Sequence, residues 1–161
     1  GVTDSKRISP RQRESLFPVI TSVALAVGVG RVSPAEVDRD GLLPATRLAM
    51  MLAVEDLALP PQYLLIDAVD MGSIVKLPQQ AMFFGDSISL SVAAASIIAK
   101  VTRDRIMLRI HSRYPEYGFA QHKGYGTVAH RAALQKHNLA PVHRKSFKPI
   151  AALTERQATA A

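Results

Sequence analysis

The sequence predicts an α/β fold, in which helices alternate with short strands of a sheet. Three features lead to this class: helical segments preceded by capping residues, a continuous apolar run at residues 63–66, and a long helical stretch at residues 85–113. The chain has 161 residues, of which 48% are hydrophobic, enough for one domain with one core. We expect this domain to cover residues 1–152 and a disordered tail to occupy residues 153–161.

The N-terminal segment is predicted to form a helix and then a strand. Ser9 and Pro10 are typical of a helix cap and of the first helical position, and the helix is expected to run to about Ile20. Residues 22–32 are rich in Val and alternate small and large side chains, a pattern that favours a strand.

Two more helices are predicted before residue 60. Ser33 and Glu36 have the spacing of a capping box at the start of a short helix. Pro44 precedes or opens a longer helix, and the pair Pro60 and Pro61 ends it.

The apolar run at residues 63–66 predicts a strand that is buried on both faces and ends at Asp67. Ligands of open α/β sheets bind beyond the carboxyl ends of the strands, so Asp67 is a candidate functional residue. An Asp that only forms a turn is an equal alternative at this position. Residues 74–77 and 81–84 are two further short strand candidates.

The stretch at residues 85–113 predicts one long helix, which Asp86 or Ser87 caps. Asp104 stands within its apolar stripe, where a carboxylate is unfavourable unless it is paired. The stripe consists of Leu90, Ala93, Ile97, Val101 and Leu108.

Two interpretations of Asp104 follow from this position. Lys100 lies one turn earlier on the helix, so the two residues form either a buried ion pair or a partly exposed edge of the stripe. Alternatively, Asp104 faces a cleft and holds a cation, for which a carboxylate is a suitable ligand.

Lys123 and Tyr125 lie in a loop with Gly124 and Gly126, just before a helix that Thr127 is expected to cap. Glycines allow a backbone to approach a ligand closely, and a cation beside an aromatic ring is a common way to hold nucleic acid. The alternative is a helix-entry loop whose Tyr folds onto the core.

The net charge of +7 favours a polyanionic partner, with nucleic acid ahead of a membrane. No apolar run approaches the roughly 20 residues that span a bilayer, and no signal peptide is visible, so we expect a cytoplasmic protein without a membrane partner. The chain has no Cys, which excludes disulfides and thiolate metal sites.

Six segments resemble ribonuclease HII and occur in the order of that family. They cover nearly the whole chain except the tail, and the long central segment followed by KGYGT is highly specific. The resemblance implies a ribonuclease H-like fold, a mixed sheet flanked by helices. The segments are DSK, ATRLAM, LLIDAV, GDSISLSVAAASIIAKVTRDRIM, YPEYGFAQHKGYGT and HRKSF.

The resemblance also implies an activity, the metal-dependent endonucleolytic hydrolysis of the RNA strand in RNA–DNA hybrids, including at single ribonucleotides in duplex DNA. In this family four acidic residues bind two cations, Mg²⁺ or Mn²⁺. Asp67 matches the third of these acids and Asp104 matches the fourth. The implied partner is a hybrid duplex, and a complete chain is expected to be a monomer.

The same resemblance suggests substrate-binding residues. Tyr125 matches the family tyrosine that packs on the sugar at the RNA–DNA junction, and Lys6 resembles a residue near the substrate backbone. Arg144 and Ser146 lie in a motif close to the substrate. Apart from the resemblance, Lys123, which neighbours Tyr125 in the loop, and Lys100 are also candidate substrate-binding residues. No role is assigned to His122, His130 or His143.

The sequence departs from the family pattern at its start. Family members carry a strand with an Asp-Glu pair and a Gly-Arg-Gly turn before DSK, and these 161 residues contain neither. We therefore expect a fold that is incomplete at the N-terminus and a chain with little or no nuclease activity, because two carboxylates are too few for two cations. Two alternatives are a non-catalytic nucleic-acid-binding module and a structural partner whose groove accepts a strand from another chain.

Overall fold

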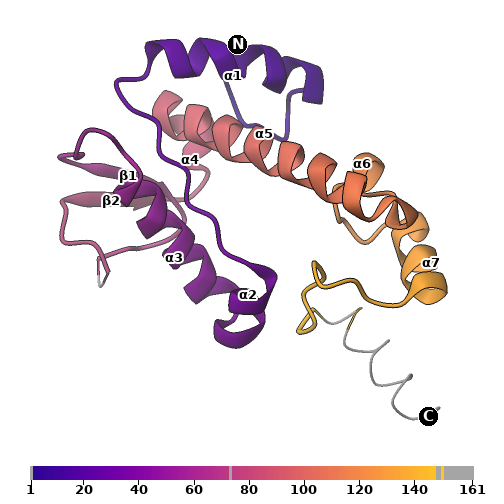
Figure 1. The fold of residues 1–161 in the computed structure, drawn as a ribbon. Coiled ribbons are helices and arrows are strands. Elements are labelled where there is room, and N and C mark those ends of the chain that lie inside the picture. Colours follow the sequence, from indigo (N-terminus) through magenta and orange to yellow (C-terminus); the bar gives the residue numbers. More distant parts are fainter. Residues whose placement is uncertain (1, 73, 148–149, 151–161) are drawn as a thin grey trace. The chain divides into compact units, whose positions relative to one another are not determined.

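A computed structural model describes residues 2–72, 74–147 and 150, which form helices and a two-stranded parallel sheet (Figure 1). The predicted α/β class is therefore confirmed. The chain divides into two compact units, of which the first comprises residues 1–31 and 46–102 and the second comprises residues 32–45 and 103–161. The tail predicted at residues 153–161 lies outside the described residues.

The first helix, α1 (Pro10–Val23), begins where the sequence predicts, because the Ser9 hydroxyl accepts the backbone N–H of Gln12. The strand predicted at residues 22–32 is wrong: after α1 the chain is extended and has no strand partner among the described residues. A Cβ added to Gly30 would lie 1.8 Å from the carbonyl oxygen of Ala49. Residues 28–30 therefore run directly against the backbone of α3 (Leu42–Glu55) instead of joining a sheet.

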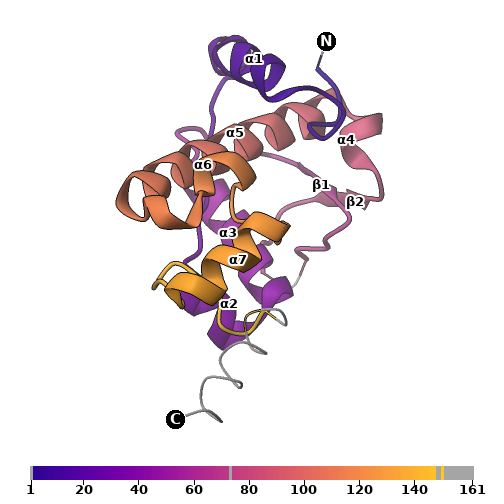
Figure 2. The ribbon, with the colours of Figure 1, turned by 90° about the vertical axis from the view of Figure 1, so that its right-hand side faces the viewer.

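The sheet consists of β1 (Leu64–Asp67) and β2 (Gln79–Met82), which lie side by side in parallel (Figure 2). Residues 74–77, a predicted strand, form no strand, and the amides of Ile74 and Val75 instead donate to the carbonyl of Met71. β2 also begins two residues before the predicted strand at residues 81–84. Leu65 is 43% exposed, so β1 is not buried on both faces.

The predicted long helix is divided into α4 (Gly85–Ile88) and α5 (Leu90–Arg113), with Ser89 in an extended conformation between them. Asp86 and Ser87 lie inside α4, so the capping role predicted for them is wrong. The middle of the apolar stripe is buried as predicted, whereas its two ends are exposed. Ala93, Ile97 and Val101 form the buried part, and Leu90 and Leu108 form the exposed ends.

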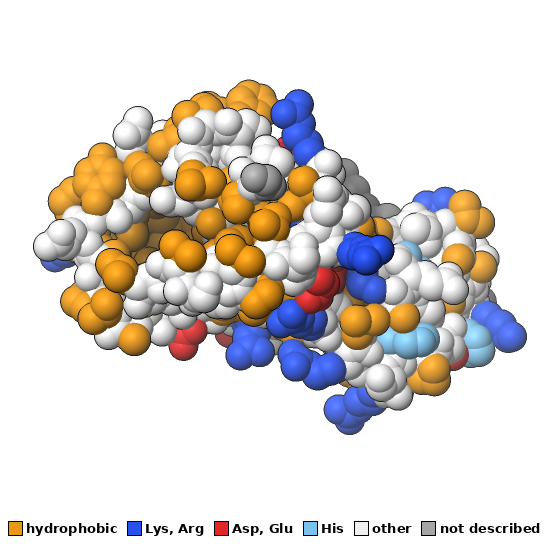
Figure 3. Space-filling model, turned by 90° about the horizontal axis from the view of Figure 1, so that it is seen from above, with side chains coloured by type: hydrophobic (Ala, Val, Ile, Leu, Met, Phe, Trp, Pro, Cys, Tyr) orange, Lys and Arg blue, Asp and Glu red, His pale blue; other side chains and the backbone are white. Residues whose placement is uncertain are grey.

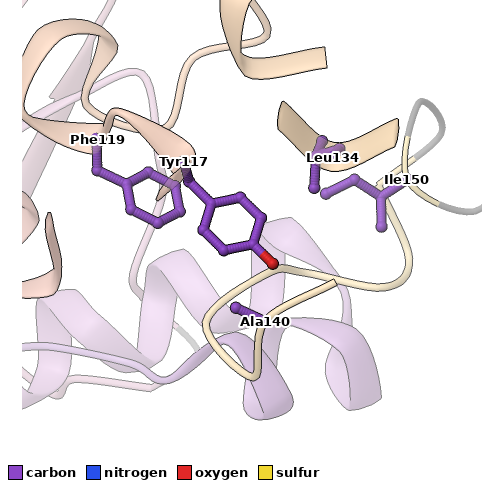
Figure 4. Close-up of a cluster of buried hydrophobic side chains, with 5 residues drawn as sticks. All are labelled: Tyr117, Phe119, Leu134, Ala140 and Ile150. Atoms are coloured by element: carbon purple, nitrogen blue, oxygen red, sulfur yellow. The ribbon is translucent and has the colours of Figure 1, made fainter. Parts of the chain in front are cut away.

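The second unit has a closed hydrophobic core (Figure 4). Its helices are α2 (Pro34–Asp40), the short η1 (Pro115–Tyr117), α6 (Phe119–His122) and α7 (Val128–His137), together with the C-terminal part of α5. The predicted caps at Ser33 and Thr127 are confirmed. The buried cluster comprises Tyr117, Phe119, Leu134, Ala140 and Ile150, and Met107 and Ile110 of α5 pack against it.

The first unit exposes much more apolar surface. Leu25 is 92% exposed, and Phe83 and Phe84 are 75% and 76% exposed. Figure 3 shows hydrophobic side chains around a hollow, over the part of Figure 1 that contains β1 and β2. Among the described residues, no helix combines the length and the apolar character needed to cross a membrane.

Candidate active site and nucleic-acid interface

Asp67 is held at the end of β1 by the loop that leads into α4. Its Oδ1 accepts the backbone N–H of Gly85 at 3.0 Å. A Cβ at Gly85 would lie 3.5 Å from the Cα of Asp67 and 3.2 Å from side-chain atoms of Met82 and Val92, so a larger residue would crowd this contact. One carboxylate oxygen is thus fixed by the backbone. The strand end therefore positions the carboxylate.

Asp104 lies on α5 in the second unit, and its side chain is only 15% exposed. The nearest guanidinium nitrogen of Arg103, Nη1, lies 3.9 Å from Asp104 Oδ1. Consecutive residues on a helix point in different directions, but the long side chain of Arg103 brings its charge back toward the Asp104 carboxylate. Asp104 is therefore a largely buried carboxylate with a guanidinium group nearby.

The two candidate metal ligands belong to different units, Asp67 to the first and Asp104 to the second. Within the described residues, no group of three or more His, Cys, Asp or Glu side chains is arranged to hold a metal ion. Both carboxylates offer hard oxygen atoms, which suit Mg²⁺ or Mn²⁺, but they supply only part of a coordination sphere. Lys100 lies on α5 in the first unit, one turn before Asp104 in sequence.

Tyr125 presents its ring to solvent and is 57% exposed, so it is not folded onto the core. The guanidinium carbon of Arg103 lies 5.1 Å from the centroid of this ring, within the range of a cation–π contact. Gly124 has φ +82°, and a Cβ there would lie 3.3 Å from Met107 Cε. Glycine is therefore required at this turn, which places the aromatic ring above α5.

Lys123 lies against the end of the helix that precedes the loop. Its ammonium group donates to the carbonyl of Ala120 near the end of α6, and its backbone adopts the left-handed conformation with φ 51°. The charge of Lys123 therefore supports the helix end, where a cation is favourable.

Lys6 is exposed, whereas the loop that carries it is held by hydrogen bonds of buried side chains. Ser5 is buried, and its hydroxyl lies 2.7 Å from the hydroxyl of Ser96 on α5. The buried Arg13 donates from Nη1 to the carbonyls of Ser5 and Ile8. Sequence reasoning missed Arg13 and Ser96, because nothing local distinguishes them from ordinary helical residues.

The segment with Arg144 and Ser146 is anchored by Asp38 of α2. Both backbone amides, of Lys145 and of Ser146, and the Ser146 hydroxyl donate to the Asp38 carboxylate at 2.6–2.8 Å. These bonds hold the pKa of Asp38 below its usual value, and the bond from the Ser146 hydroxyl has the largest effect. Arg144 lies over the ring of Phe147, with its guanidinium carbon 5.1 Å from the ring centroid. Asp38 was also missed, since it lies more than a hundred residues away from its partners in sequence.

The fold is similar to that of a solved structure, the crystal structure of the ribonuclease H2 from Pyrococcus horikoshii OT3. The TM-score is 0.81 at 28% sequence identity, and the match covers 97% of this chain and 81% of that chain. The fold, with one candidate acid at a strand end and one on a helix, is thus that of a ribonuclease H2-like protein.

The sequence comparisons give the family. The model of the family described as Ribonuclease HII matches residues 1–150. Ribonuclease HII of Geobacillus kaustophilus (strain HTA426) is 51% identical over 150 residues, and that of Desulfitobacterium hafniense (strain DSM 10664 / DCB-2) is 49% identical. Each match covers 93% of this chain and 57% of the relative. The chain belongs to the ribonuclease HII family, and it spans little more than half the length of these relatives.

Proposed function

We propose that the chain provides the substrate-binding part, and two of the acidic ligands, of an endonuclease that hydrolyses the RNA strand of RNA–DNA hybrids, including single ribonucleotides in duplex DNA. Family membership carries this proposal. The exposed ring of Tyr125 beside Arg103, in a chain with a net charge of +7, supports it. The partner is a hybrid duplex, and the location is cytoplasmic.

Each residue has a role in this proposal. Asp67 and Asp104 hold a divalent cation, Mg²⁺ or Mn²⁺. In the two-cation chemistry that the family implies, one ion would activate the attacking water and the other would stabilise the leaving oxygen. Tyr125 stacks on the sugar at the RNA–DNA junction, and Arg103 keeps the ring in place and adds positive charge near the phosphates. Lys6, Lys100, Lys123 and Arg144 add positive charge for the nucleic-acid backbone, and Ser146 fixes the loop that carries Arg144.

The polypeptide of these 161 residues is expected to cleave hybrids slowly or not at all. Two cations a few ångströms apart need several converging carboxylates, and Asp67 and Asp104 supply only two. A second candidate function is therefore binding of nucleic acid without cleavage. The exposed and positioned Tyr125 favours this function, because stacking on a ring requires no metal.

Binding and cleavage by the purified chain test both functions. Fluorescence anisotropy with a labelled RNA–DNA hybrid and with a DNA duplex of the same sequence, in Mg²⁺ and in Mn²⁺, should show tighter binding of the hybrid. Tyr125→Ala should weaken that binding roughly tenfold, because burying an aromatic side chain against the substrate contributes about 1.5–3 kcal/mol. The proposal would be refuted if the chain bound the two duplexes with equal affinity and Tyr125→Ala left the affinity for the hybrid unchanged.

The acidic residues are tested by a matched set of variants. Asp67→Asn and Asp104→Asn should remove the part of hybrid affinity that depends on divalent cations, whereas Glu116→Gln should leave it intact, because Glu116 is an exposed carboxylate outside the site. Rapid Mg²⁺-dependent cleavage by the unsubstituted chain would show that the expectation of low activity is wrong.

A further inference from the structure

Three buried histidines form a row behind the Tyr125 loop in the second unit. His122, His130 and His143 are 8%, 4% and 6% exposed. The rings of His122 and His130 stack with centroids 4.4 Å apart, and Nε2 of His130 lies 3.2 Å from Nε2 of His143. Phe119, which is 2% exposed, contacts all three rings with centroid distances of 5.4–5.8 Å. These histidines thus lie in a dry environment, where each ring nitrogen needs a partner.

The hydrogen bonds of His130 fix the position of its proton. Nδ1 of His130 lies 3.0 Å from the carbonyl oxygen of Tyr125. A carbonyl oxygen only accepts hydrogen bonds, so Nδ1 carries the proton and donates it. In the neutral ring Nε2 of His130 is then an acceptor, and it accepts a hydrogen bond from the protonated Nε2 of His143.

The bonds of His143 agree with this direction. Its Nδ1 accepts the backbone N–H of Ala140 at 3.0 Å, which leaves the proton on Nε2 for His130. Nδ1 also lies 3.1 Å from the carbonyl oxygen of Ala140, and a hydrogen bond to that oxygen needs a proton on Nδ1. In a neutral ring this proton would leave two acceptors, the Nε2 atoms of His143 and His130, facing each other, so the bond requires the ring to gain a second proton. Burial opposes that step, because it lowers the pKa of His143 and of His130. The neutral chain of bonds therefore runs from Ala140 through His143 and His130 to Tyr125.

His122 holds the other side of the same loop. Its Nε2 lies 2.7 Å from the carbonyl oxygen of Tyr117 and therefore donates, while its Nδ1 accepts the N–H of Gly124 at 3.2 Å. The amide of Tyr125 in turn donates to the carbonyl of His122 at 2.9 Å. The backbone of Tyr125 is thus bonded on both sides, at its N–H and at its C=O, while its ring stays exposed.

We propose that His130 and His143 are positioning residues, which fix the carbonyl of Tyr125 so that its ring is held ready for the nucleic acid. This inference rests on the proposed function of Tyr125 and assigns the residues on which it depends. Neither histidine touches the nucleic acid in this arrangement, because both are buried. Their effect on binding therefore passes through the Tyr125 loop.

The protons can be located without any nucleic acid. Long-range ¹H–¹⁵N correlation spectra of the histidine rings at pH 7.5 should show His130 protonated at Nδ1, and His122 and His143 protonated at Nε2. Free histidine prefers the Nε2 proton, so the expected state of His130 is distinctive. An Nε2 proton on His130 would overturn the inference, whatever the chain binds.

Two substitutions of His130 separate positioning from stability. His130→Asn keeps a donor near the place of Nδ1, whereas His130→Gln keeps only a polar group near the place of Nε2, and both leave a similar cavity. With hybrid affinity measured at a temperature where both variants are folded, we expect His130→Gln to bind roughly five- to tenfold more weakly than His130→Asn, the effect of one lost hydrogen bond. Equal affinities would overturn the inference.

The same pair in a Tyr125→Ala background completes the test. If His130 acts through Tyr125, the difference between the Asn and Gln variants disappears there, and a difference that persists would overturn the inference. If Tyr125→Ala alone binds the hybrid as tightly as the unsubstituted chain, the proposed role of Tyr125 fails. The inference is then overturned as a statement about nucleic acid, even where the ring protons lie as expected.

Discussion

The two units of the chain differ in how they support their candidate residues. In the second unit, the backbone of Tyr125 is bonded to buried histidines beside an aromatic core that the unit supplies itself. In the first unit, Asp67 ends a two-stranded sheet whose surroundings include Phe83 and Phe84, both about three-quarters exposed. The comparison indicates that the Tyr125 loop is supported within its own unit, whereas the strand-end acid depends on a sheet with little cover of its own.

The largest expected effect is the difference in stability loss between two phenylalanine substitutions, one in each unit. Phe119→Ala should lower the free energy of unfolding by about 3–5 kcal/mol, because Phe119 is 2% exposed. Phe83→Ala should change it by less than about 0.5 kcal/mol, because Phe83 is 75% exposed. Urea unfolding followed by circular dichroism measures both values. A loss at Phe83 as large as that at Phe119 would show that the first unit buries this surface in solution.

Two glycines provide a second comparison. Gly30→Ala should destabilise the first unit by about 1–3 kcal/mol, because its Cβ would overlap the backbone of α3. Gly126→Ala in the second unit should have little effect on stability, since a Cβ there meets open space. The same unfolding experiment measures both. A neutral Gly30→Ala variant would contradict the close packing of residues 28–30 on α3.

A pH titration should act on the second unit through its histidines. Burial holds the pKa of His130 and of His143 below 6.5 in the folded chain, so the unfolded chain takes up protons first as the pH falls. The free energy of unfolding should therefore be highest above about pH 7 and decrease as the pH falls through 6.5 toward the lower folded values. Tyr fluorescence follows this transition, because three of the four tyrosines lie in the second unit. In the His143→Gln variant the free energy of unfolding should depend less steeply on pH. A slope equal to that of the unsubstituted chain would contradict the inference that His130 and His143 are both neutral in the folded chain.

The smallest expected effect concerns Arg103. Arg103→Gln should weaken hybrid binding about two- to fivefold, because it removes a cation–π contact of about 0.5–1 kcal/mol with Tyr125. Arg109→Gln removes the same charge from an exposed position on α5 and serves as the control. If both variants lose affinity equally, Arg103 contributes only charge.

Local signals predicted the fold where a few neighbouring residues determine the structure. The caps at Ser9, Ser33 and Thr127 start helices as expected, because each hydroxyl bonds an amide three residues later. The strand predicted at residues 22–32 was wrong, because the contact of Gly28 and Gly30 with α3 is a tertiary feature that alternation of side-chain size does not reveal.

The site was predictable to a similar extent. The position of Asp104 within an apolar stripe and of Asp67 at a strand end singled out both residues before any family was considered. Asp38, Arg13 and the pair His130 and His143 were not predictable, because their partners lie elsewhere in the chain or are backbone groups. Whether Asp67 and Asp104 share one cation stays a prediction.

The most direct test of that prediction is a titration of the ¹⁵N-labelled chain with Mn²⁺, in which the paramagnetic ion broadens the amide signals nearest to it. The account predicts that the signals around Asp67 and around Asp104 broaden together at the lowest Mn²⁺ concentrations, and that Asp104→Asn weakens the broadening at both. Broadening at only one of the two aspartates, or first at another part of the chain, would contradict it.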